Sequence, residues 1–276
     1  MSIHSTAVVD SRALLGRGVT IGPFSTIEDG VEIGDHCVIG AHVTVLRHTA
    51  LGEGCRIHAG AVLGDLPQDL GFKNDAATYV KIGKRCTIRE HVTIHRGTKP
   101  GTATEVGDDC FLMAGAHLAH NVKLCDRVII ANGAMLGGYV QVGERTFISG
   151  NVGIHQFVKI GRLAMLGGNS GISKDVPPFC MVATVAFNRI AGLNTVGMRR
   201  AGLSPADRAV VKDAFRLLYR SGLNVTQAAE RIKALGSPLA LEFSAFIEQS
   251  SRGLCPFGEK DDANGDPIRR QCPEGE

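Results

Sequence analysis

Residues 106–142 read VGDDCFLMAGAHLAHNVKLCDRVIIANGAMLGGYVQV, and an aliphatic residue returns at every sixth position along them. The same period runs from Ile3 to Leu63 without a miss. It resumes at Ile82 and, after one skipped position at Pro100, continues in the same phase to Ile172. A period of six does not fit the 3.6 residues of a helical turn, so it excludes helices over this region. It predicts one short strand and one turn in every hexapeptide.

Three such hexapeptides close one triangular coil, with the periodic aliphatic side chains pointing inward. One coil cannot bury its own aliphatic side chains, whereas stacked coils can, and their backbones then hydrogen-bond at a spacing of about 4.8 Å. We therefore predict a mainly β chain, a parallel β-helix of hexapeptide repeats over residues 1–189. Two stretches break the period and are expected to be loops, residues 65–81 and 96–105.

Helix signals follow the last repeat. Ser204 is a typical N-cap residue, and Pro205 suits the first position of a helix that ends near Gly222. Two further helices are predicted, from about Thr226 to Leu235 and from Pro238 to about Ser251.

We assign these helices to a small α-helical C-terminal domain over residues 190–254. Residues 255–276 are rich in glycine, proline and charge, and we predict that they form a disordered tail.

Composition excludes several classes of protein. The net charge is only +3, which is too small to predict a nucleic-acid partner, and no apolar run is long enough to span a membrane. The N-terminus shows no signal peptide. The eight cysteines are scattered and form no CxxC pair, so we expect buried, reduced thiols and a cytoplasmic protein.

Two histidines mark a candidate catalytic site. His117 and His120 flank the inward-pointing Leu118, so both imidazoles can face outward. In a coil of three hexapeptides the column above His120 contains Gly138 and then Gln156. The imidazole can act as a base, and the backbone N–H of a glycine one layer away can donate a hydrogen bond to the developing oxyanion. Gly138 suits this role because no Cβ blocks a close approach.

Two other uses of these histidines are open. Outward histidines on a β-helix can be ordinary surface residues, and we assign His36, His42 and His48 to that class. A zinc site needs a third ligand, but no third histidine is placed near His117 and His120. We therefore predict no metal and no cofactor.

Seven segments in order resemble the UDP-N-acetylglucosamine O-acyltransferase family of lipid A biosynthesis. They are LPQDL (66–70), IREHVTIHRGT (88–98), HLAHN (117–121), GIHQFVKIG (153–161), DVPPF (175–179), NTVGMRRAG (194–202) and FRLLYRSG (215–222). The resemblance covers about residues 1–254. It implies a left-handed β-helix, a homotrimer with active sites between subunits, and transfer of a fatty, often 3-hydroxylated, acyl group from acyl carrier protein to the glucosamine 3-hydroxyl of a UDP-sugar.

The resemblance also implies a role for individual residues. His120 matches the general base and Gly138 the oxyanion donor. Gly168 matches a position where side-chain size limits acyl length, so a glycine leaves room for a longer chain. The remaining matches are substrate contacts: Gln68, Asp69, His117, His155 and Gln156 around the sugar, His95 near the pyrophosphate, and Asn194 and Arg200 at the nucleotide.

The chain departs from the family at several of these positions. Asn121 follows the matched base where several relatives have Asp, and an amide supplies no charge to stabilise an imidazolium. Tyr139 stands where histidine is common, and Val196, Ala201 and Gly71 replace charged residues. These changes leave open a 3-amino sugar nucleotide as the acceptor, which would make the chain an N-acyltransferase. A non-catalytic β-helix that only binds is the third hypothesis.

The predicted helices carry a partner signal. Their polar faces are basic, which is typical either of a solvated surface or of a docking site for the acidic acyl carrier protein that the resemblance implies. The residues concerned are Arg199, Arg200, Arg208, Lys212, Arg216, Arg220, Arg231 and Lys233.

Overall fold

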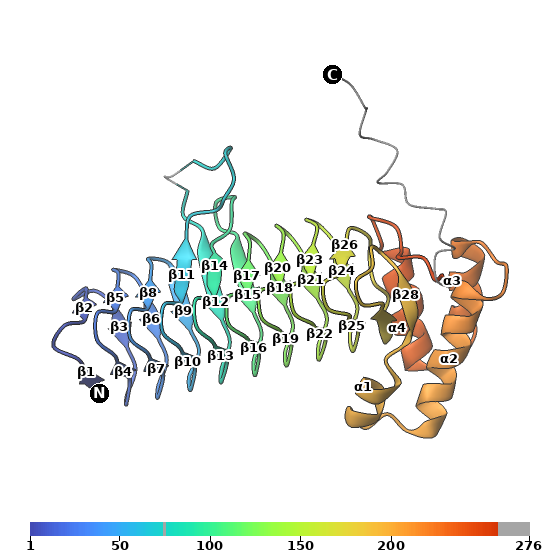
Figure 1. The fold of residues 1–276 in the computed structure, drawn as a ribbon, viewed down its shortest axis with the longest axis horizontal. Coiled ribbons are helices and arrows are strands. Elements are labelled where there is room, and N and C mark those ends of the chain that lie inside the picture. The colour runs from blue at the N-terminus through green and yellow to red at the C-terminus, as the bar shows by residue number, and fades with distance from the viewer. Residues whose placement is uncertain (74–75, 259–276) are drawn as a thin grey trace, which may run out of the picture.

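The computed structural model describes residues 1–73 and 76–258 of the chain (Figure 1). A long three-sided prism of short strands carries a group of helices at its C-terminal end, and one large loop projects from its side. Within the described residues, no helix is both long and apolar enough to cross a membrane.

The three sides of the prism are three sheets, in which strands three apart in the sequence are hydrogen-bonded neighbours, except at the end of sheet A, where β27 follows β25 and β28 follows β27. Sheet A contains β1 (Ser2–Ile3), β4 (Thr20–Ile21), β7 (Val38–Ile39), β10 (Arg56–Ile57), β13 (Thr87–Ile88), β16 (Phe111–Leu112), β19 (Ile129–Ile130), β22 (Phe147–Ile148), β25 (Met165–Leu166), β27 (Cys180–Val182) and β28 (Ile190–Leu193). Sheet B contains β2 (Val8–Val9), β5 (Thr26–Ile27), β8 (Thr44–Val45), β11 (Val62–Asp65), β14 (Thr93–His95), β17 (His117–Leu118), β20 (Met135–Leu136), β23 (Gly153–Ile154) and β26 (Gly171–Ile172). Sheet C contains β3 (Leu14–Leu15), β6 (Glu32–Ile33), β9 (Thr49–Leu51), β12 (Tyr79–Ile82), β15 (Ala103–Val106), β18 (Lys123–Leu124), β21 (Gln141–Val142) and β24 (Lys159–Ile160).

The register confirms the predicted coil. Ser2 pairs with Thr20 and Ile3 with Ile21, so a regular coil advances by three hexapeptides, and the pairing is parallel. The one antiparallel pair among the described strands joins β27 to β28, where the chain leaves the prism.

The periodic aliphatic side chains fill the prism as predicted, except at its N-terminal end. Ile94, in the middle of the prism, is 0% exposed, whereas Ile3 is 43% exposed. Val9 and Leu15 are only partly buried. The first coil has a neighbour on one side only, so its side chains cannot be covered from both sides.

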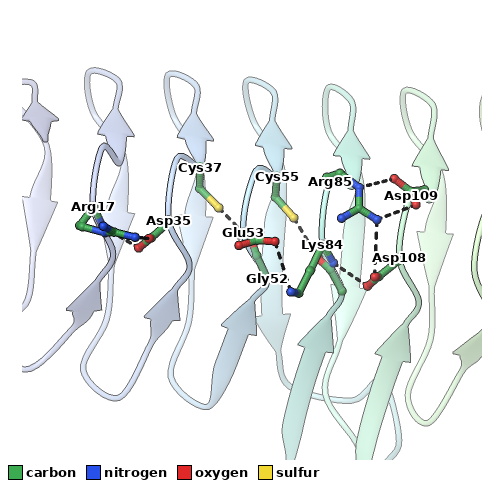
Figure 2. Close-up of polar contacts among 11 residues, drawn as sticks. Arg17, Asp35, Cys37, Gly52, Glu53, Cys55, Lys84, Arg85, Asp108 and Asp109 are labelled. Atoms are coloured by element: carbon green, nitrogen blue, oxygen red, sulfur yellow. Dashed lines mark hydrogen bonds and ion pairs between the residues drawn. The ribbon is translucent and has the colours of Figure 1, made fainter.

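A column of thiols runs along one inner corner (Figure 2). The Sγ of Cys37 donates to the carbonyl of Gly52, and the Sγ of Cys55 donates to that of Gly83, both at 3.1 Å. Cys86 and Cys110 repeat the contact in the next two coils. A thiol is small enough for the corner and supplies one weak donor to an inward carbonyl.

The cysteines within the described residues are all free, and six of the seven are buried as predicted. Cys125 is the exception and is exposed, because it stands on the outer turn of its coil instead of at the inner corner. Cys272 lies outside the described residues.

The two predicted interruptions are loops with slightly different bounds. β12 begins at Tyr79 and β15 at Ala103, so both loops end a few residues earlier than the period indicates. The reason is that Tyr79 to Ile82 pairs with Ala103 to Val106 in parallel, which extends sheet C beyond the two-residue strands of an ordinary coil.

The C-terminal part contains four helices, α1 (Thr195–Arg200), α2 (Pro205–Tyr219), α3 (Val225–Lys233) and α4 (Pro238–Glu248). Ser204 is the N-cap of α2, as predicted, and the structure adds a full capping box with Asp207. Helix α1 was not predicted, since six residues are too few for a periodic pattern. The second and third predicted helices were too long at their C-terminal ends. The boundary between the two domains, after residue 189, stays a prediction.

Asp175 joins the helices to the prism. Its side chain is fully buried, its Oδ1 accepts from the Lys159 N–H at 2.7 Å, and its Oδ2 accepts from the Ser250 hydroxyl at 2.7 Å. Arg162 adds a two-point ion pair with Glu242 on α4, at 2.9 and 2.7 Å.

The predicted disordered tail begins too early. Cys255 is fully buried, and the ring of Phe257 lies against Phe215 and Tyr219, because the segment around these two residues covers the apolar face of α2. The rest of the predicted tail, residues 259–276, lies outside the described residues.

These burial differences give a stability test at two equivalent positions. Ile94→Ala is expected to lower the free energy of unfolding by about 2–5 kcal/mol, because it leaves a cavity in a packed column. Ile3→Ala, at the open end, is expected to change it by no more than about 0.5 kcal/mol. Urea unfolding followed by circular dichroism measures both variants. Equal losses of unfolding free energy in the two variants would contradict the conclusion that the first coil is packed on one side only.

Candidate active site

The candidate site lies at the corner where sheet B turns into sheet C. The Tyr139 N–H donates to the carbonyl of His120 at 3.0 Å, and the Phe157 N–H donates to that of Gly138 at 2.9 Å. His120, Gly138 and Gln156 therefore stand in one column, as their spacing of one coil predicts. The residue after each of them has a left-handed backbone, with φ of 60°, 61° and 67° for Asn121, Tyr139 and Phe157.

The absence of a side chain at Gly138 leaves room for the His120 ring. A Cβ on Gly138 would lie 2.3 Å from Cε1 of His120 and 2.6 Å from its Nε2, so any larger residue would push the imidazole away. The ring therefore lies directly against the glycine backbone. In the described part of the chain, no group accepts a hydrogen bond from the Gly138 N–H. A free backbone donor thus stands beside Nε2.

Asn121 determines which ring nitrogen of His120 carries the proton. Its Oδ1 lies 3.0 Å from the backbone nitrogen of Thr98, which can only donate, so the oxygen and not the amide nitrogen faces Thr98. The same oxygen lies 3.1 Å from Nδ1 of His120. Nδ1 must then donate its proton, and Nε2 keeps a free lone pair for proton abstraction.

Thr98 and Tyr139 extend this arrangement into a chain of hydrogen bonds. The Thr98 hydroxyl donates to Asn121 Oδ1 at 2.9 Å and lies 2.9 Å from the Tyr139 hydroxyl. Because Thr98 has already used its only hydroxyl proton, Tyr139 must donate to it. The Tyr139 ring packs edge-on against His120 and flat on Phe157. No carboxylate takes part in this chain of hydrogen bonds.

His117 lies on β17, three residues before His120, and is held neutral. Its Nδ1 is 2.7 Å from the Thr93 hydroxyl, and its ring packs edge-on against His95 with centroids 4.9 Å apart. Burial, helped by His95, lowers the pKa of His117 to about 4. Burial also lowers the pKa of His95. Both rings are therefore uncharged at neutral pH, and His117 can donate or accept a hydrogen bond.

A groove on sheet B gathers several of the predicted sugar contacts. Gln68, His117 and His155 line the same cavity of about 490 Å³, which passes Ala119 and Gly137 beside His120 and Gly138. Asp69 stands on the adjoining loop, where its Oδ1 accepts from the Gly71 N–H at 2.8 Å.

His95 is less accessible than its predicted contact with a pyrophosphate implies. It is buried, and its Nδ1 has no hydrogen-bond partner among the described residues. The ring packs against His117 and leaves only 6% of the residue exposed, so little of it is open to a pyrophosphate.

The two predicted nucleotide contacts lie elsewhere. Asn194 and Arg200 line a cavity of about 500 Å³ beside sheet A, together with Val196 and Ala201. Its other lining residues are Arg127, Ile129, Arg145, Phe147, Leu163, Met165 and Gly197. It shares no lining residue with the groove on sheet B.

The Asn194 side chain is already used by the fold. Its Oδ1 accepts from the Gly197 N–H at 2.9 Å as the N-cap of α1, and its Nδ2 donates to the carbonyl of Leu163 at 2.8 Å. A nucleotide can use only its second lone pair or its second proton. Arg200 lies in the last turn of α1 and is exposed.

Comparison with known families agrees with these observations. Residues 175–255 match the model described as UDP N-acetylglucosamine O-acyltransferase, domain 2, and residues 12–47 and 103–138 match that of the bacterial transferase hexapeptide. An acyl-[acyl-carrier-protein]–UDP-N-acetylglucosamine O-acyltransferase of Thermodesulfovibrio yellowstonii is 41% identical over 256 residues, which cover 92% of this chain and 98% of the relative. The chain belongs to this O-acyltransferase family.

Solved structures of family members agree with the fold. The UDP-N-acetylglucosamine acyltransferase of Bacteroides fragilis superposes with a TM-score of 0.87 at 36% identity, covering 91% of this chain and 98% of that one. The Francisella novicida enzyme gives 0.89 at 35% identity, with 95% of each chain covered. The left-handed winding and the enzyme class implied by the resemblance are thereby confirmed.

The sequence did not predict two groups of residues that the structure places at the candidate sites. The sequence gives no signal for Thr98, because this residue stands in a loop where the period is lost. Its hydroxyl nevertheless donates to Asn121, the residue that holds His120. Arg127 and Arg145 line the second cavity. The sequence does contain a signal for these two arginines: they are turn residues of like charge, spaced by one coil, and so stand next to each other in one column.

We expect Thr98→Val to lower kcat about tenfold and to leave KM nearly unchanged, because the variant loses the hydroxyl that orients Asn121. Thr98→Ser keeps that hydroxyl and should restore activity. Thr44→Val, a threonine on sheet B outside the site, is the control. Steady-state kinetics over a range of pH, with a melting curve for each variant, provide the measurement. A Thr98→Ser variant as slow as Thr98→Val would exclude the positioning role.

Proposed function

We propose that this protein transfers a fatty acyl group, in its family commonly 3-hydroxylated, from acyl carrier protein to the 3-hydroxyl of UDP-N-acetylglucosamine. The reaction would be the first step of lipid A biosynthesis and would take place in the cytoplasm. The observation that carries the proposal is the contact between His120 and Gly138, which brings a base with a free Nε2 next to a free backbone N–H. The names of the relatives favour an oxygen acceptor over a 3-amino sugar.

The proposed reaction begins with proton abstraction. His120 Nε2 removes the proton of the sugar hydroxyl as the hydroxyl oxygen attacks the thioester carbonyl. Asn121 holds the imidazole through Nδ1 during this step. The neutral His117 and the side chains of Gln68 and His155 line the groove in which we place the sugar. Gln156 stands nearby, in the column of His120 and Gly138.

Collapse of the tetrahedral intermediate completes the transfer. The negative charge on the former carbonyl oxygen is stabilised by the Gly138 N–H, which is fixed in the backbone and needs no rearrangement. The carbon–sulfur bond then breaks, the carrier-protein thiolate leaves, and it takes the proton from His120. The products are the acylated sugar nucleotide and the free carrier-protein thiol.

We further propose that the active form is a homotrimer with its sites between subunits. The groove beside His120 lies on sheet B, and the cavity of Asn194 and Arg200 lies beside sheet A. A rigid prism cannot fold one face onto another, so a single nucleotide that touches both sets of residues requires two protomers. Arg127, Arg145 and Arg200 would supply positive charge to the diphosphate.

His120→Ala is expected to reduce transfer by about 10²–10⁴-fold and to leave the melting temperature unchanged, since the ring lies outside the core. The assay follows acylated UDP-N-acetylglucosamine from an acyl carrier protein thioester. His36→Ala removes another turn histidine of the prism and should retain full activity. Near-normal turnover by His120→Ala would refute the assignment of His120 as the general base.

Helix α2 is the proposed docking surface for the acidic carrier protein. Lys212 and Arg216 lie four residues apart, on one face of the helix, and both are exposed. Arg220 is less suited to the role, because its guanidinium lies 4.8 Å over the ring of Phe257 and helps to hold that ring against α2.

Lys212→Glu combined with Arg216→Glu should slow the reaction with carrier-protein thioesters, mainly through kcat/KM. The reason is that rim charges act on the encounter rate, and their effect is screened within about 8 Å at physiological salt. The activity of the unaltered protein should fall with salt more steeply than that of the variant. Arg56→Glu with Lys81→Glu makes the same charge change on the prism and serves as control. Equal kinetics for both double variants would remove α2 from the docking site.

A further inference from the structure

Arg96 is a buried cation directly after β14. The residue is 5% exposed, and its Nε forms no hydrogen bond within the described residues. Burial, together with the charge of Arg47, lowers the pKa of the guanidinium below its usual value. Arginine is seldom buried unless it is paired, because an unpaired charge away from water costs free energy. The guanidinium is therefore expected to make a specific contact that an apolar side chain could not.

That contact is with Phe72. The Cζ of Arg96 lies 5.6 Å from the centroid of the Phe72 ring, which is within the range of a cation–π interaction. Arginine suits this contact better than lysine, because its flat guanidinium stacks on a ring and is more weakly hydrated than an ammonium group. A cation–π interaction is also stronger when it is shielded from water. Arg96 thereby holds the Phe72 ring in place.

Phe72 belongs to the same turn as two predicted sugar contacts. Its N–H donates to the carbonyl of Asp69 at 3.0 Å, and the Asp69 Oδ1 accepts from the Gly71 N–H at 2.8 Å. Asp69 and Phe72 are therefore parts of one turn, and Gln68 is the residue before it. Leu70, within this turn, is 108% exposed and cannot anchor it. The Phe72 ring is thus the apolar side chain through which the turn is fixed.

The backbone of Arg96 is itself fixed at the base of this loop. Its N–H donates to the carbonyl of Asp65 at 3.0 Å, where the loop begins. The N–H of Gly97 donates to the carbonyl of Tyr79 at 3.3 Å, where the loop has ended. Both ends of the loop that projects from the prism thus meet two successive residues (Figure 1). The turn is therefore held at a rigid base and, farther out, at one ring.

We propose that Arg96 is a positioning residue for the sugar nucleotide. Its guanidinium holds the Phe72 ring, and the turn then presents Gln68, with Asp69 beside it, to the groove. The inference rests on the proposed function, in which these two side chains contact the sugar. Thr98, two residues after the arginine, holds the amide that orients the base. One short segment thus sets the acceptor and the base through separate contacts.

Arg96→Met removes the charge and keeps an unbranched side chain. It is expected to raise KM for UDP-N-acetylglucosamine about fivefold to thirtyfold, or about 1–2 kcal/mol at about 1.4 kcal/mol per tenfold, and to leave kcat within about twofold. The melting temperature should stay the same or rise, because the variant no longer buries an unpaired charge. Phe72→Leu should raise KM as well. The double variant should be no worse than the more impaired single variant, since both changes remove one contact.

The donor side gives an internal control. KM for the acyl carrier protein thioester and the preferred acyl length should not change in Arg96→Met. Gly168, the position matched to acyl length, does not line the groove, and a Cβ there would lie 3.4 Å from the carbonyl of Gly150. Arg17→Met and Phe24→Leu alter an exposed arginine and an exposed phenylalanine in the early coils, and they should leave every one of these constants unchanged.

The possible results separate the two proposals. An unaltered protein that transfers no acyl chain would overturn the proposed function itself. An active protein in which Arg96→Met leaves KM for the sugar nucleotide unchanged would overturn only this inference. So would a rise in KM for Arg96→Met without one for Phe72→Leu, which would indicate that the guanidinium contacts the substrate directly. Additive losses in the double variant would overturn the inference for the same reason. If Arg96→Met does not fold, Phe72→Leu decides alone against its control, and an unchanged KM contradicts the positioning role.

Discussion

The backbone hydrogen bonds between successive coils set the spacing on which every other feature of the molecule depends. Each coil repeats the one before it at about 4.8 Å, and this distance leaves little depth for a side chain in any column. Where one side chain must lie along the column, its neighbour must be small. His120 lies against Gly138, Phe187 lies against Gly171, and the inner corner is filled by thiols that reach the next carbonyl. Catalysis and packing therefore obey one steric rule.

Much of the fold and part of the site follow from the sequence because this spacing is written into it as a period. The six-residue repeat predicts the strands and their buried faces, and three repeats to a coil predict that His120 and Gly138 share a column. Prediction weakens wherever the chain leaves the period. Thr98 comes from a loop, so nothing in the sequence shows that it meets Asn121. Arg96 and Phe72 also meet outside the regular repeats, and the short helix α1 gives no periodic signal.

The family resemblance implies what the site residues do, whereas the structure shows where they lie. Resemblance assigns Asn194 and Arg200 to the same substrate as His120, but it says nothing of where they lie. The structure places them in a separate cavity and shows that the Asn194 amide also caps a helix. It also explains how Asn121 can replace a carboxylate. The amide oxygen receives three donors at once, so it holds the imidazole by geometry where an acid would hold it by charge as well.

The open first coil has a consequence for how such a molecule can change in length. Every predicted site residue follows residue 67, and the coils before it repeat the same register without contributing to the groove. A solenoid of this kind can lose or gain one whole turn there and still present the same interior surface to its neighbour. Insertion of a complete coil of three hexapeptides is therefore a smaller perturbation than insertion of a single amino acid, since the latter would rotate every later side chain out of its column.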